Sequence, residues 1–198
     1  MNTETTKKLG TTRAIDSKSY KSGSVGLYVG TFHKYNCGSL DGRWWYLCNY
    51  ADVDDLLADI AEYHADESDP EYMVQDWDNL PHGVTASDMG ECIDRARLEM
   101  LFDLEQSDER ELVADYLGTG QNIWDYADFD ELLDAARNAC VGTLDTQSWN
   151  PFRDWAVEFF IECNDIPESL VGYLDEEKIE REFGWDFHPG EKYVFSKN

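Results

Sequence analysis

Between Trp44 and Asp94 the chain has no lysine and no arginine, although 14 of these 51 residues are Asp or Glu. The whole sequence of 198 residues has 16 basic and 42 acidic residues, a net charge of −26. The shortage of basic residues is greatest over residues 51–134, with 26 acidic against 3 basic residues. A field of this sign repels phosphate groups, which argues against nucleic acid and anionic membranes as partners. The predicted partner is therefore basic.

An acidic coat for solubility or high salt is the alternative explanation of this charge. Such a coat should be uniform, whereas residues 1–24 carry 5 basic and 2 acidic residues. These residues are rich in Ser, Thr, Lys and Gly and are predicted to form a flexible basic tail. The uneven distribution favours a specific acidic surface in the middle of the chain.

Long apolar runs and paired cysteines are also missing. The sequence has no run of 18 apolar residues that could span a membrane, and its N-terminus lacks the apolar core of a secretory signal. No C-x-x-C motif occurs, which argues against a zinc ribbon or a thioredoxin-type site. We expect buried, reduced thiols and a cytoplasmic protein. The five cysteines are Cys37, Cys48, Cys92, Cys140 and Cys163.

Catalytic and metal-binding motifs are absent as well. The stretch DVDDLL places Leu56 and Leu57 where an EF-hand loop needs a ligand and glycine. There is no H-E-x-x-H, G-x-S-x-G or phosphate-binding loop, and His64 is expected at the surface or half-buried. Pairs of carboxylates occur by chance in any acidic protein, so they do not predict a glycosidase. We predict no enzyme activity, no cofactor and no metal.

The first unit, residues 25–83, has the pattern of a small α+β domain. Leu27 and Val29 lie on alternate positions of a predicted strand that extends to Phe32, and Arg43–Cys48 forms a second strand. A helix over residues 52–66 is predicted with Asp52 as N-cap, followed by a third strand over residues 71–79.

Residues 84–135 are predicted to be helical and residues 136–198 to mix helices with a small sheet. Ser87 is the expected cap of a helix through Leu104, Ser107 opens another, and Asp128 with Glu131 begins a third. Asn150 and Pro151 begin an apolar helix, followed by a helix over residues 175–183 and a strand over residues 191–196. The tryptophans are expected in the core: Trp44, Trp45, Trp77, Trp124, Trp155 and Trp185.

Two segments resemble the ArdA family of antirestriction proteins. They are LYVGTFHKYNCGSLDGRWWYL and, some 25 residues later, DPEYMVQDWDNLP. The segments SDERELVADYL and DIPESLVGYLDEEKIEREF are also similar, so that the resemblance covers residues 25–198. It implies an α+β fold in which three small domains form an elongated chain, and a homodimer joined through the C-terminal domain.

The resemblance also implies a DNA mimic encoded on mobile elements. Such a protein occupies the DNA-binding groove of type I restriction-modification enzymes, so that incoming DNA escapes cleavage. The alternatives are an acidic chaperone or inhibitor of other basic DNA-binding proteins and, more weakly, a hydrolase with a carboxylate pair. The acids expected to be exposed in place of phosphates are Asp52, Asp54, Asp55, Asp59, Glu62, Asp66, Glu67, Asp69, Asp88, Glu91, Asp94, Glu99, Asp103, Glu105, Asp108, Glu109, Glu111 and Asp115.

Overall fold

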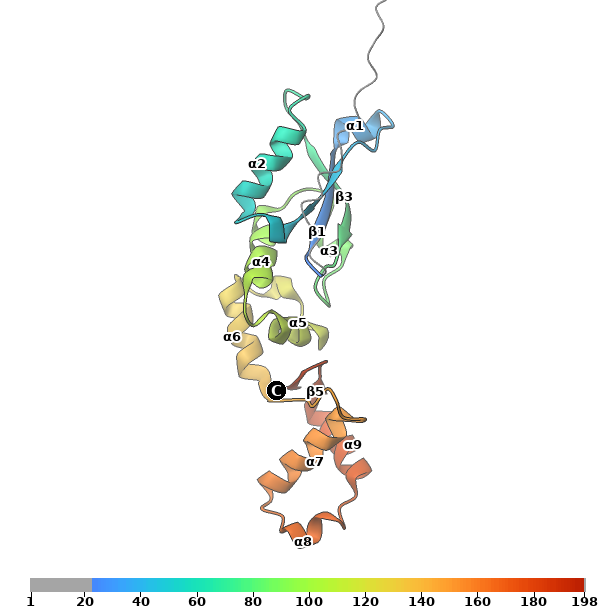
Figure 1. Cartoon of the computed structure of the whole chain (residues 1–198), viewed down its shortest axis with the longest axis vertical. Helices are drawn as coiled ribbons and strands as arrows, with labels where there is room; N and C mark the ends of the chain where they lie inside the picture. Colours follow the sequence, from blue (N-terminus) through green and yellow to red (C-terminus); the bar gives the residue numbers. More distant parts are fainter. Residues whose placement is uncertain (1–22, 198) are drawn as a thin grey trace, which may run out of the picture.

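The computed structural model describes residues 23–197. Figure 1 shows an elongated molecule, in which a sheet with its helices, a helical middle and a second sheet with its helices follow one another along the long axis. Within the described residues there are nine α-helices and two three-stranded antiparallel sheets. The predicted mixed α+β class is confirmed. No described helix is long and apolar enough to cross a membrane.

The first sheet has the strand order β2-β1-β3. Its central strand β1 (Gly26–Thr31) pairs antiparallel with β2 (Arg43–Tyr46) and with β3 (Tyr72–Asp78). Alternation sends Leu27 and Trp45 to one face, where both are buried. Helix α2 (Val53–Tyr63) covers this face, and Trp45 makes an edge-to-face contact with Tyr63, with ring centroids 5.5 Å apart.

Two boundaries in this unit differ from the predictions. Phe32 is not part of the strand, because the Thr31 hydroxyl accepts the Lys34 N–H and starts helix α1 (Phe32–Asn36). Strand β2 ends at Tyr46, and the 3₁₀ turn η1 (Leu47–Asn49) follows. The predicted basic tail lies outside the described residues except for Gly23 and Ser24, and the buried Ser24 hydroxyl accepts the Cys48 N–H.

The middle of the chain is helical, as predicted, but its first helix is divided in two. Helix α3 (Ala86–Met89) is capped by Thr85 and not by Ser87, in a capping box with Asp88. Gly90 ends it with φ +74°, a conformation that favours glycine, and α4 (Arg95–Gln106) begins after the N-cap Asp94.

Three further elements complete this helical region. They are α5 (Arg110–Gly118), the 3₁₀ turn η2 (Ile123–Asp125) and α6 (Phe129–Ala139). Ser107 does not cap α5 directly; its hydroxyl accepts the Glu109 N–H just before the helix. The Asp128 cap of α6 is confirmed, because its carboxylate accepts the Glu131 N–H.

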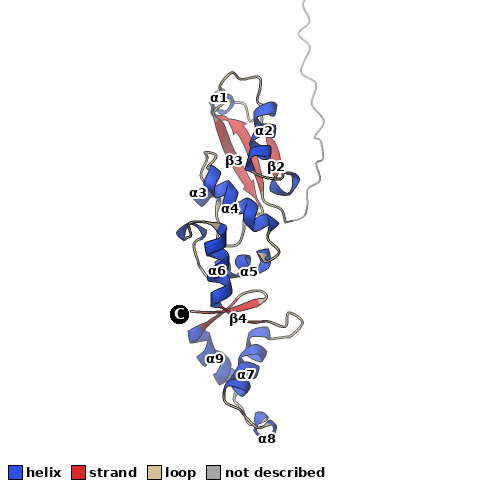
Figure 2. Ribbon diagram, turned by 90° about the vertical axis from the view of Figure 1, so that its left-hand side faces the viewer, coloured by secondary structure: helices blue, strands red, loops and turns tan. Residues whose placement is uncertain are grey.

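The last unit combines helices with the second sheet, of order β4-β6-β5. Its strands are β4 (Cys140–Thr143), β5 (Phe187–Pro189) and β6 (Tyr193–Ser196), and only β6 was predicted. Its helices are α7 (Pro151–Cys163), α8 (Glu168–Val171) and α9 (Glu176–Asp186). The predicted start of α7, with Asn150 as cap and Pro151 in the first turn, is confirmed. Figure 2 shows these helices at the far end of the molecule.

One core of buried side chains extends from Val25 in the first unit to Phe195 in the last. The Asp115 carboxylate of α5 also accepts the backbone N–H groups of Lys192 and Tyr193, which fixes the second sheet to the helical region. The three-domain division at residues 25–83, 84–135 and 136–198 stays a prediction.

Three expectations about single side chains are wrong. The cysteines are free but none is buried, and Cys37, Cys92 and Cys163 are exposed. His64 is fully buried beside Trp45, because it directly follows α2 at the end of the helix that packs on the sheet. Neither Trp185 nor Trp44 belongs to the core: 74% of the Trp185 surface is exposed at the end of α9, and Trp44 is only half-buried.

Candidate functional site

Three acidic helices succeed one another along the long axis: α2, α4 and α6 (Figure 1). Each turns its apolar residues inward, with Leu56, Leu101 and Leu132 fully buried. The helical period then leaves the acids on the outer surface, where residues three or four apart are neighbours. The exposed acids on these helices are Asp54, Asp55, Glu62, Glu99, Asp103, Asp130, Glu131 and Asp134.

Arg95 joins the acids of α2 to those of α4. Its guanidinium lies 2.6 Å from Asp54 Oδ1 and 2.7 Å from Glu99 Oε1. The hydrogen bond and charge of Arg95 lower the pKa of Asp54. This end of the surface therefore has part of its negative charge balanced within the molecule.

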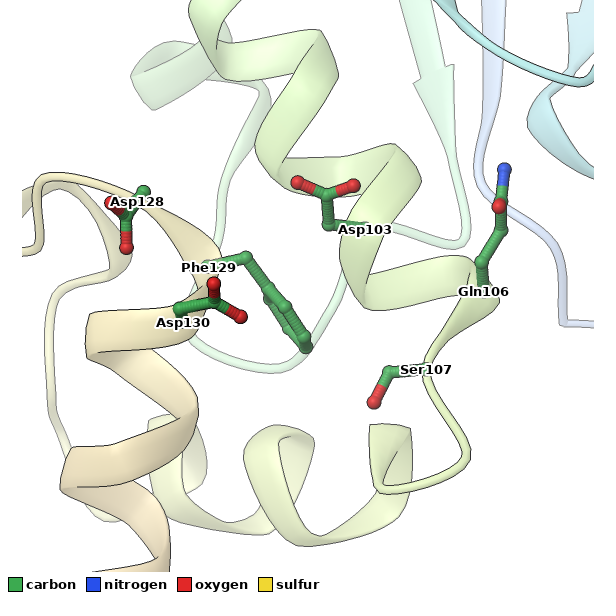
Figure 3. Close-up of a pocket in the computed structure, with 6 residues that line it drawn as sticks. All are labelled: Asp103, Gln106, Ser107, Asp128, Phe129 and Asp130. Carbon is green, nitrogen blue, oxygen red and sulfur yellow. The ribbon is translucent and has the colours of Figure 1, made fainter.

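The junction of α4 and α6 has a different character. Asp103, Asp128 and Asp130 surround an open hollow of about 420 Å³, together with Gln106, Ser107 and Phe129. Figure 3 shows Asp103 projecting from α4 on one side, with Asp128 and Asp130 from the start of α6 on the other. Burial raises the pKa of Asp103, and the charges of Asp130, Glu99 and Asp128 raise it further. We call these three carboxylates the α4–α6 seam; no ion pair to any of them is found among residues 23–197.

Most of the acids predicted for the surface are indeed exposed. The exposed ones are Asp52, Asp54, Asp55, Glu62, Asp66, Asp69, Glu91, Asp94, Glu99, Asp103, Asp108 and Glu111. Several of these also act within the fold: Asp52 and Asp94 cap helices, and Asp66 lies 3.1 Å from Lys34 Nζ. That contact lowers the pKa of Asp66.

The other predicted acids are half-buried, which corrects the expectation that all would be exposed. They are Asp59, Glu67, Asp88, Glu105, Glu109 and Asp115. Each has an internal partner: Asp59 pairs with Arg43, Glu105 with Arg110, and Glu109 with Arg137. Glu67 accepts the Thr31 hydroxyl, and Asp88 accepts the Thr85 backbone N–H. Because folding already uses these carboxylates, they are poor candidates for binding a partner.

Sequence reasoning missed the acids of α6 and its cap. The missed acids are Asp128, Asp130, Glu131 and Asp134. Their spacing within a predicted helix was a usable signal, because Asp130 and Asp134 are one helical turn apart. Their closeness to Asp103, more than 20 positions earlier, follows only from the packing of α6 against α4.

The chemistry available to this surface is electrostatic. No group of three or more His, Cys, Asp or Glu side chains in the described part of the chain has a geometry that could hold a metal ion. Exposed carboxylates from three successive helices can instead attract a basic partner over a long range and pair with its Lys and Arg side chains.

Residues 27–195 match the family model described as Antirestriction protein (ArdA). This match confirms the resemblance seen in the sequence and covers nearly all of the chain. A comparison with curated proteins found no match.

Proposed function

The chain belongs to the ArdA family of antirestriction proteins, and from this premise we propose that it mimics B-form DNA and occupies the DNA-binding groove of a type I restriction-modification enzyme. Membership implies an antirestriction function and interaction with restriction enzymes. The mimicry, the groove and the enzyme type are our proposal. Its result would be protection of an incoming mobile element from cleavage.

The observation that carries the proposal is the line of exposed acids along α2, α4 and α6. A duplex presents one negative charge per ~1.7 Å of its axis, counting both strands. Acids three or four positions apart on a helix lie about 5 to 6 Å from one another, and successive helices extend the line. A basic groove built for phosphates would be attracted by such a surface through the same field.

The proposed inhibition is competitive occupancy. Carboxylates take the positions of phosphates, and the enzyme's Lys and Arg side chains pair with them in place of DNA. No covalent bond is made or broken. The α4–α6 seam contributes most to binding per residue. Its carboxylates form no ion pair within residues 23–197, so no internal cation competes with the Lys and Arg side chains of the enzyme.

We further propose that the active form is a homodimer joined through the C-terminal unit. In this unit Tyr173 is 86% exposed and Trp149 is fully exposed, in addition to Trp185. Large exposed aromatic residues favour a protein interface. Sedimentation should show a dimer for the unaltered chain, and Trp185→Ser with Tyr173→Ser should shift it toward monomer. A monomer at micromolar concentration for the unaltered chain would reject this part of the proposal.

The test of the main proposal is displacement of a labelled duplex from a purified type I enzyme. The protein should release the duplex nearly stoichiometrically, and excess duplex should in turn relieve the inhibition. A strongly basic protein that is not a nuclease, such as a histone, serves as the control and should bind far more weakly. Equal binding to both would favour the acidic chaperone. Inhibition without release of DNA would rule out occupancy of the groove.

A further inference from the structure

The first sheet has a second face, opposite to the one that α2 covers. Trp45 points toward α2, so its neighbours Trp44 and Tyr46 point to the other side, as does Tyr28. Antiparallel pairing with β3 adds Asp76 opposite Tyr28 and Asp78 opposite Gly26. We call Tyr28, Trp44, Tyr46, Asp76 and Asp78 the aromatic–carboxylate face.

Each cross-strand row on this face runs from an aromatic residue on β2 to a carboxylate on β3. One row is Trp44, Tyr28 and Asp76, and the other is Tyr46, Gly26 and Asp78. Glycine at 26 is required for this arrangement, because a Cβ there would lie only 2.6 Å from the Tyr46 ring. The Tyr46 ring therefore lies close against the backbone of β1.

The aromatic rings of this face pack on one another. Trp44 stacks with Tyr46 at 6.0 Å between centroids and meets Tyr28 edge-on at 5.6 Å. The Tyr28 hydroxyl donates to Leu40 O, which fixes the ring. Trp44 remains half-buried and Asp76 is exposed. A rigid aromatic platform beside a carboxylate costs little conformational entropy on binding.

We propose that the aromatic–carboxylate face binds an arginine-bearing segment of a protein partner. Paired strands are about 4.8 Å apart, so a guanidinium lying on Tyr28 or between Tyr28 and Trp44 is within reach of the Asp76 carboxylate. Arginine fits better than lysine, because its planar group both stacks on an aromatic ring and donates in parallel to a carboxylate. The net charge of −26 attracts cationic partners and repels nucleic acid.

The protein contains the same arrangement internally, on the face that α2 covers. The Arg43 guanidinium lies 4.7 Å from the Trp45 ring centroid and 5.2 Å from that of Tyr63, and it pairs with Asp59 at 2.6 Å. An aromatic pair with a neighbouring aspartate thus holds a guanidinium within this domain. Because the proposed face lies opposite α2, it is separate from the acidic surface, and the inference does not rest on the proposed function.

The experiment compares labelled nona-arginine with nona-lysine as probes for the full-length protein. At about 0.5 M NaCl the screening length falls to a few ångströms, which suppresses the general attraction of either peptide to the acidic surface. Nona-arginine should then bind about fivefold or more tightly than nona-lysine, as expected for cation–π contacts. Equal affinities of the two peptides would overturn the proposal.

Two variants test whether the preference for nona-arginine arises at the aromatic–carboxylate face. Asp76→Asn with Asp78→Asn, and separately Trp44→Leu, should each abolish most of the preference for arginine. The matched control, Glu168→Gln with Glu191→Gln, makes the same change in charge at exposed acids of the C-terminal unit and should keep it. The conservative aspartate variant keeps the test valid if Trp44→Leu fails to fold. A preference that survives both face variants would overturn the proposal.

The alternative is that basic residues of the same chain occupy the aromatic–carboxylate face. Replacing Lys7, Lys8, Arg13, Lys18 and Lys21 by Gln in the full chain should leave nona-arginine affinity at high salt within about twofold, if the face receives a partner. A rise of tenfold or more would show that these residues occupy the face, and would overturn the proposal of a partner.

Discussion

Two regions of the acidic surface, its α2 end and the α4–α6 seam, differ in whether internal cations balance their negative charge. At the α2 end Arg95 joins Asp54 to Glu99, and Lys34 lies beside Asp66. At the α4–α6 seam Asp103 faces Asp128 and Asp130 across a hollow (Figure 3). Arg95 lowers the pKa of Asp54, whereas burial, together with the charges of Asp130, Glu99 and Asp128, raises the pKa of Asp103.

This contrast separates two uses of a carboxylate. An acid paired with an internal cation stabilises the fold, but it offers less to a partner. An acid held near like charges weakens the fold, and that repulsion is relieved when a partner supplies the missing cations. The seam is therefore the part of the surface that we expect to gain most from a basic groove.

The largest effect should follow from neutralising the whole acidic surface. Changing eight exposed acids to Asn or Gln should weaken binding to the type I enzyme about 10³-fold, at roughly half a kcal/mol per charge. Equilibrium competition with a labelled duplex measures this. The eight acids are Asp55, Glu62, Glu99, Asp103, Asp128, Asp130, Glu131 and Asp134.

Eight exposed acids of the C-terminal unit provide the charge-matched control. Their loss should weaken binding about tenfold or less, because only the long-range field changes. Equal losses in the two variants would mean that net charge, and not the surface on α2, α4 and α6, governs binding. The control acids are Glu158, Glu162, Asp165, Glu168, Glu176, Glu177, Glu182 and Glu191.

Salt should have the next largest effect on binding by the unaltered protein. Raising NaCl from about 50 to about 200 mM should weaken the complex with the enzyme about 100-fold, since many exposed charges are screened together. Titrations at four salt concentrations give the slope. The eight-acid variant should show a much shallower slope, and an affinity of the unaltered protein that does not change with salt would contradict mimicry.

The seam alone should account for a distinct share of binding. Asp103→Asn, Asp128→Asn and Asp130→Asn together should weaken binding about 30-fold, from three charges at roughly 0.7 kcal/mol each, more than the average for the acidic surface. Asn at 128 keeps a good helix cap, so α6 should remain folded. A triple variant at Asp54, Asp66 and Glu99 should lose less, because internal cations already pair with these acids. A larger loss of binding in the variant at Asp54, Asp66 and Glu99 than in the seam variant would refute the distinction between the two regions.

The smallest effect is on the free energy of unfolding, and we expect opposite signs for a substitution at the α4–α6 seam and one at the α2 end. Asp103→Asn should stabilise the protein at pH 7 by about 0.2–0.5 kcal/mol, the size of one like-charge pair such as Glu99 and Asp103. Asp54→Asn should destabilise it, because the contact with Arg95 is lost. Thermal unfolding of both variants measures the difference.

The pH dependence gives an independent check on those signs. The raised pKa of Asp103 means that its unfavourable contribution appears as pH rises above the ordinary aspartate value near ~3.9. The lowered pKa of Asp54 means that its favourable contribution is present above that value and is lost as pH falls through the lower one. Both variants should therefore match the unaltered protein at strongly acidic pH, and a difference that persists there would not be electrostatic.

Much of the local structure could be read from the chain. The caps Asp52, Asp128 and Asn150 were predictable because a side-chain oxygen accepts a backbone N–H two or three residues on, which is a local interaction. The short strands β4 and β5 were not predictable, because three or four residues carry too little pattern and pairing with β6 defines them. His64 was misjudged because its burial depends on contacts with Trp45 and Tyr72, which come from strands on either side of it in the chain.

The sequence by itself determined the sign and magnitude of the charge, its concentration in the middle of the chain, and the family. These follow from composition and from motifs that need no folding to be recognised. Only the tertiary structure decided which carboxylates bind internal cations, which are half-buried, and which gather at the α4–α6 seam. The reason is physical: the energy of a charge depends on neighbours within a few ångströms, and folding brings those neighbours from distant positions in the chain.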